Sequence, residues 1–114
     1  MDLIKSLDWI VALEMWFISE HGKVEQTISH GQLDILQLTE NTSNFPMLNW
    51  LFDNFYNDPV IYPNISKSLA NEILALANDF TSKNRKQYLP SCQVLNEFFG
   101  KAFAENQVIY TISD

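Results

Sequence analysis

The residues able to do nucleophilic, acid–base or metal chemistry are few in this chain and widely spaced. There are two histidines, His21 and His30, nine residues apart, and one cysteine, Cys92. The histidines lack the spacing of a helical metal site such as H-E-x-x-H. With only three glycines, the chain has no glycine-rich loop for a phosphate or a dinucleotide. The sequence therefore predicts no metal site, no cofactor and no enzymatic activity.

Two single residues have a chemical interpretation beside a structural one. Cys92 is a candidate nucleophile only if a histidine or a helix start favours its thiolate; we favour a small buried side chain. Glu14 falls inside an apolar arc if residues 3–18 are helical, where a buried carboxylate could act as a general acid. We favour a carboxylate that lies at a rim or is paired, because one such acid without a partner is not an active site. A small hydrolase that uses Glu14 with a second acid would need a deep pocket.

The element expected at the centre of the fold is a helix over residues 3–18. At about 100° per residue, most of its aliphatic side chains share one side, and Trp9, Leu13 and Trp16 lie on the opposite side. A helix that is apolar on two sides needs neighbours on both. His21-Gly22 would then form its C-cap.

The rest of the chain is expected to alternate short extended segments with helices. Residues 23–28 alternate like a strand, and 31–39 fits either a hairpin strand after His30-Gly31 or a short helix, which we favour. Further helices are predicted over 45–57, from 64 or 66 to about 80, and over 90–104. An extended connector over 60–63 would join the first two of these. The β-branched residues 107–112 predict a C-terminal strand that would pair with residues 24–28.

These elements predict one domain over residues 1–114 that is mostly α. The expected architecture is a bundle of four to five helices, compatible with a small two- or three-stranded sheet, and the alternative class is α+β. At 46% hydrophobic residues, a chain of this length can form a core without disulfides or metals. The single cysteine indicates a reducing compartment, and no stretch has the length or flanking charges of a leader or a membrane span, so we expect a cytoplasmic protein.

The charge is strongly negative and unevenly distributed. The formal net charge is −7, and residues 1–82 hold eleven acidic residues against three lysines. Such a body repels phosphates, which argues against direct binding of nucleic acid, and its field would attract a basic protein partner. A surface that serves only solubility is the alternative interpretation.

The predicted binding surface lies on and after the 45–57 helix. Trp50 falls on the side of this helix opposite most of its apolar residues, beside a carboxylate, which is a composition typical of binding hot spots. The alternative is that another element covers this tryptophan. The predicted partner-binding residues are Trp50, Asp53, Asn54, Tyr56, Asp58, Tyr62, Asp34 and Glu40.

In its size, acidity and aromatic–acidic segment LNWLFDNFYNDPVIYP, residues 48–63, the chain resembles the immunity proteins of bacterial toxin–immunity pairs, most nearly those of contact-dependent growth inhibition. The resemblance covers the whole chain without a shared motif, so no residue roles are carried over. It implies a protein without catalytic activity that binds a cognate, often basic, nuclease toxin domain and blocks its active site or substrate surface. Carboxylates that face the toxin's lysines and arginines would give fast association.

We therefore predict a non-enzymatic inhibitor of a basic toxin domain that binds neither nucleic acid nor membrane. The alternative is a small regulatory adaptor, or a phage-type protein, that binds a host protein through the same acidic–aromatic patch. The oligomeric state stays open, because an uncovered Trp9 and Trp16 would equally suit a homodimer face.

Overall fold

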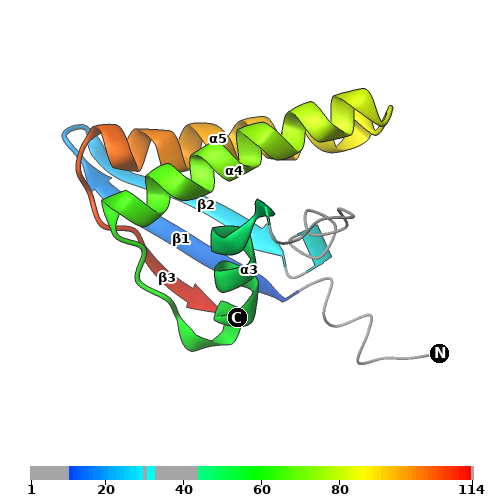
Figure 1. Ribbon diagram of the computed structural model, residues 1–114. Helices are drawn as coiled ribbons and strands as arrows, with labels where there is room; N and C mark the ends of the chain where they lie inside the picture. The colour runs from blue at the N-terminus through cyan, green and yellow to red at the C-terminus, as the bar shows by residue number, and fades with distance from the viewer. Residues whose placement is uncertain (1–10, 30, 33–43, 114) are drawn as a thin grey trace.

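The computed structural model describes residues 11–29, 31–32 and 44–113. Three α-helices and a three-stranded antiparallel sheet with the order β2-β1-β3 make up this part of the chain (Figure 1). The class is therefore α+β, the alternative expectation, and the bundle of four to five helices is wrong. In chain order the elements are β1 (Ala12–Ser19), β2 (Gly22–Ser29), α3 (Pro46–Asp53), the 3₁₀ turn η2 (Phe55–Asn57), α4 (Pro63–Ser82), the 3₁₀ turn η3 (Lys86–Tyr88), α5 (Leu89–Ala104) and β3 (Tyr110–Ser113).

The second half of the expected N-terminal helix is the central strand β1. Its side chains alternate: Leu13, Met15 and Phe17 are at most 1% exposed and face the core, while the residues between them face the other way. The helix prediction is wrong here because β1 is apolar on both faces, so the two-residue period of a strand is hidden in the sequence. Residues 3–10, Trp9 among them, lie outside the described residues.

A tight hairpin joins β1 to β2. Glu20 and His21 form the turn, and Gly22 follows with a φ of 120°, which side chains other than glycine rarely adopt. The glycine that suggested a helix C-cap is thus a hairpin residue, and the predicted strand over 23–28 is confirmed as part of β2. The predicted C-terminal strand is also present but pairs with β1, from Leu13↔Ser113 to Trp16↔Tyr110, and not with residues 24–28.

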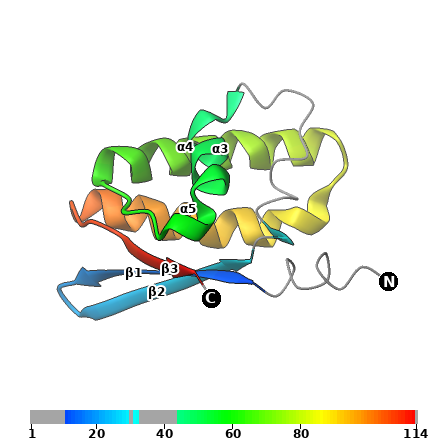
Figure 2. The same cartoon turned by 90° about the horizontal axis from the view of Figure 1, so that it is seen from below.

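All three helices lie on one side of the sheet. Figure 2 shows the strands as one layer with α3, α4 and α5 on the same side of it. The predicted helix from 64 or 66 to about 80 is present as part of α4, and its apolar residues Leu69, Ile73, Leu76 and Phe80 are buried. From β1 to α5, the rings of Phe17 and Phe98 lie 5.3 Å apart, centroid to centroid. The core therefore sits between the inner face of the sheet and the α4–α5 pair.

Helix α3 is attached to α4 through a carboxylate at its N-terminus. The predicted 45–57 helix is split into α3 and η2, and Pro46 lies in the first turn of α3, where its missing N–H costs no helical hydrogen bond. The N-cap residue of α3, Phe45, makes no side-chain capping hydrogen bond. Instead, the Met47 N–H donates to both carboxylate oxygens of Glu72, at 2.9 and 3.1 Å, and the Leu48 N–H donates to one of them at 3.0 Å. The negative charge thus lies at the positive end of the helix dipole.

The outer edge of β3 is covered by the segment that leads into α4. Ile61 and Ile109 exchange N–H···O=C hydrogen bonds of 2.9 Å, and the Thr111 hydroxyl donates to the Pro59 carbonyl at 2.6 Å. The Ser113 N–H donates to the Asp58 carboxylate at 2.8 Å. The expected connector between two prolines therefore runs antiparallel along β3 and closes this edge of the sheet.

The contact of Glu72 with α3 leads to a test of stability. Glu72→Gln keeps the shape of the side chain but removes its charge, so we expect the free energy of unfolding in urea to fall by about 1–2 kcal/mol. Glu97→Gln, a matched change at an exposed position of α5, should change it by less than about 0.5 kcal/mol. Equal effects of the two variants would contradict the capping role.

Candidate functional site

The face of the sheet that points away from the three helices is the candidate site. Strand alternation and the two pairing registers place residues of all three strands on it. The Ile61↔Ile109 bridge puts Val60 beside Tyr110 at its border. We define the outer sheet face as Glu14, Trp16, Ile18, Lys23, Glu25, Thr27, Val60, Tyr110 and Ile112.

The outer sheet face is unusually apolar for a solvated surface. Four of its residues, with 39–56% of their area exposed, belong to the nine exposed large hydrophobic residues of the described part of the chain. An antiparallel sheet with one solvated face normally carries polar side chains there. Clustered exposed apolar residues with a polar rim are typical of protein interaction sites. The four are Ile18, Val60, Tyr110 and Ile112.

Trp16, half-buried, is the centre of this face. Its ring lies 6.3 Å from that of Tyr110 on one side, and the Lys23 ammonium lies 5.2 Å from its centroid. The same ammonium pairs with the Glu25 carboxylate at 2.9 Å. Beside them is a depression of about 270 Å³, lined in part by Glu14, Trp16, Glu25 and Ile112. An aromatic ring, a cation and two carboxylates thus meet on one open surface.

Among the predicted partner-binding residues on α3, Trp50 is not exposed. It is half-buried and packs against the core, which favours the alternative that neighbouring elements cover it. Its carbonyl accepts a hydrogen bond of 2.9 Å from the Asn54 side-chain amide, so Asn54 caps the C-terminal end of α3. Asp53 is exposed.

Of the other predicted site residues, some lie near the border of the sheet and two lie outside the described residues. Tyr56 and Tyr62 are exposed. Asp58 is exposed too, but its carboxylate accepts hydrogen bonds from the Ser113 N–H and hydroxyl. Asp58 and Tyr62 therefore lie on the segment beside β3, next to the outer sheet face. Asp34 and Glu40 lie outside the described residues.

The sequence prediction missed Trp16, Tyr110 and Ile112 as site residues. The signal for the last two was the alternation of the C-terminal strand, which places every second residue on one face. For Trp16, the helix assigned to residues 3–18 concealed the strand. The same error placed Glu14 inside an apolar arc, where we favoured a carboxylate at a rim or in a pair over a buried general acid; its side chain is exposed on the outer sheet face. The premise of the hydrolase hypothesis therefore fails.

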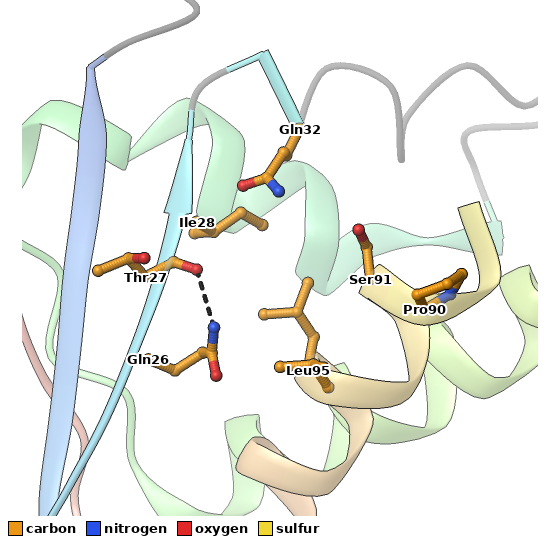
Figure 3. Close-up of a pocket in the computed structure, with 8 residues that line it drawn as sticks. Gln26, Thr27, Ile28, Gln32, Pro90, Ser91 and Leu95 are labelled. Carbon is orange, nitrogen blue, oxygen red and sulfur yellow. Dashed lines mark hydrogen bonds between the residues drawn. The ribbon is translucent and has the colours of Figure 1, made fainter. Parts of the chain in front are cut away.

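A second hollow lies on the helix side of the sheet, between β2 and the start of α5. It has a volume of about 240 Å³, and Figure 3 shows Gln26, Ile28 and Leu95 among its lining residues. The Gln26 amide donates to the Thr27 carbonyl at 3.2 Å, and the Gln32 side chain accepts from the Ser29 N–H at 2.9 Å. These amides are used to satisfy the backbone of β2. None of the described residues that line this hollow has a titratable side chain.

Cys92 is buried in α5. Burial raises the pKa of its thiol from 9.0 to about 11, so the thiol stays protonated at neutral pH. The structural interpretation of this cysteine is thus favoured over the nucleophile. Among the described residues, no group of three or more histidine, cysteine, aspartate or glutamate side chains is arranged to hold a metal ion.

Comparison with protein-family models, with curated proteins and with solved structures found no match to this chain. Within the described residues, no helix combines the length and apolar character needed to cross a bilayer.

The environment of Cys92 predicts low thiol reactivity. Raising its pKa by about two units lowers the thiolate fraction at pH 8 about 100-fold, and burial restricts access further. Reaction with a disulfide reagent should therefore be at least about 100-fold slower in the native protein than in urea. Absorbance of the released thiolate measures both rates. Rapid reaction in the native state would show that the α4–α5 pair opens at this position.

Proposed function

We propose that this protein is a non-enzymatic binding protein that neutralises a basic bacterial toxin domain by occluding its active site or its substrate surface. The observation that supports this function best is the outer sheet face. An apolar centre of Trp16, Tyr110 and Ile112 with a rim that includes Glu14 and Glu25 has the anatomy of a binding interface. It would suit a partner that presents an apolar centre ringed by lysine and arginine.

The charge of the chain supports the choice of a basic partner. Eleven acidic residues against three lysines in residues 1–82 create a long-range field that favours encounter with a positive surface. Asp53 and Asp58 add negative charge on α3 and beside β3. A nuclease domain carries positive charge where it binds phosphates, so carboxylates on this protein would compete with its substrate.

The toxin hypothesis is tested in two steps. The tagged protein is used to capture partners from the source cell at low and high salt, and the most abundant basic partner is then expressed in a bacterial host with and without this protein. We expect the partner alone to stop growth and co-expression to restore it. A partner that leaves growth unaffected would contradict toxin neutralisation and favour the regulatory adaptor.

The role of the rim charges is tested by charge reversal at Glu14. Glu14→Lys should slow association with the captured partner about tenfold at low salt, since it places a like charge at the interface. Glu97→Lys makes the same change of net charge on α5, outside the outer sheet face, and should slow association about twofold or less. Stopped-flow fluorescence at several salt concentrations measures the rates. Equal slowing by both variants would place the interface elsewhere.

A further inference from the structure

We propose that the outer sheet face contains a subsite for an arginine side chain of the partner, formed by Trp16, Glu14 and Glu25, and that Lys23 fills it in the free protein. The inference rests on the proposed function for the existence of a basic partner, but not on the toxicity of that partner.

The chain's own lysine shows that this place binds a cation. In the pairing of β1 with β2, Trp16 lies opposite Glu25 and Ile18 lies opposite Lys23. Lys23 therefore reaches diagonally across the strands, where its ammonium lies 5.2 Å from the Trp16 centroid and 2.9 Å from a Glu25 carboxylate oxygen. One ammonium is thus bound by an aromatic face and a carboxylate together, the two groups that attract cations in proteins.

The lysine is held weakly enough to be replaced. The side chains of Lys23 and Glu25 are 52% and 66% exposed. Exposed ion pairs of this kind contribute little to stability, and a lysine that leaves the ring regains full hydration without moving the backbone. Displacement of Lys23 by a partner therefore needs no change in the fold.

Among the described charges around Trp16, one carboxylate has no opposite charge paired with it. Glu14 lies on the same face of β1, two residues before Trp16, and is exposed. Within the described part of the chain it has no ion-pair partner, and it lines the depression of about 270 Å³ together with Ile112. Two carboxylates against one lysine favour the arrival of a further cation at this depression.

Arginine fits this arrangement better than lysine does. Its planar guanidinium can stack on the indole ring while its N–H groups donate to a carboxylate in the same plane, whereas an ammonium is a compact point charge. The Trp16 ring is also supported by Tyr110 at 6.3 Å, so it offers a firm face for stacking. A partner arginine would thus take both interactions that Lys23 makes and could reach Glu14 as well.

Lys67 provides a matched control within the same chain. Its ammonium lies 5.3 Å from the centroid of the Phe103 ring, so it makes a cation–π contact like that of Lys23. In the described residues no carboxylate pairs with it, and neither residue lines the depression beside Trp16. Neutralising Lys67 therefore changes the net charge and removes a cation–π contact without opening the proposed subsite.

The experiment uses a hexa-arginine peptide as the probe, titrated into the full chain at low salt. Binding is followed by NMR through the backbone amide signals of β1 and β2 in every variant, and also through the indole N–H signal of Trp16 in the variants that keep this residue. Lys23→Gln should increase the affinity about fivefold, because the subsite is emptied, whereas Lys67→Gln should increase it less than twofold. Trp16→Leu and Glu25→Gln should each lower the affinity in the Lys23→Gln background, and unchanged urea midpoints relative to that background would confirm folding.

Equal gains in affinity for Lys23→Gln and Lys67→Gln would overturn the subsite, since the peptide would then sense only net charge. A peptide that leaves the Trp16 signal unshifted would overturn it as well. Because the probe is a peptide, failure of the toxin hypothesis leaves this test intact. Conversely, a partner that is neutralised equally by the wild type and by Trp16→Leu would overturn the subsite while the proposed function stands.

Discussion

The structure depends on the position of β1 as the middle strand of the sheet. β1 is hydrogen-bonded to β2 on one side and to β3 on the other, and its inward side chains Leu13, Met15 and Phe17 form the floor of the core. Each contributes about 1.5–3 kcal/mol by its burial. A shift of one residue would place Glu14 under the helices and expose all three, which fixes the register. The same register places the side chains of Trp16 and Ile18 on the outer sheet face.

The two edges of the sheet are protected by different means. At β3, residues 58–61 supply backbone and side-chain partners, so this segment and the C-terminal strand hold each other in place. At β2, the amide of Gln26 and the side chain of Gln32 satisfy backbone groups near the strand's end, and the charged pair Lys23–Glu25 lies near its start. Charges and local caps on an edge strand discourage pairing with other chains. The proposed partner would therefore meet the face of the sheet and not its edges.

The sequence predicted the elements in which the spacing of apolar residues distinguishes a helix from a strand. It missed β1, in which this spacing does not. In α4 the apolar residues repeat at helical spacing with polar residues between them, and β2 alternates visibly, so both were predicted. In residues 13–18, Glu14 is the only polar residue, so a helix and a strand fit equally well. Trp50 was chosen from its position on a helical wheel, but it is half-buried, because packing against the core is decided by elements distant in sequence. Asp58 was predicted as a binding carboxylate, but its bonds to Ser113 depend on a pairing that the local sequence does not specify.

The proposed binding role accounts for the outer sheet face better than folding alone does. A hydrophobic side chain contributes to stability when folding removes it from water, yet Ile18, Tyr110 and Ile112 keep 46–56% of their area exposed, and all the described helices lie on the other side of the sheet. Threonine or lysine at these positions would suit the strands and lower the risk of aggregation. The carboxylates and the lysine around Trp16 limit that risk while leaving the apolar centre exposed. An open, charged and aromatic face of this kind gains its full burial only when a partner covers it.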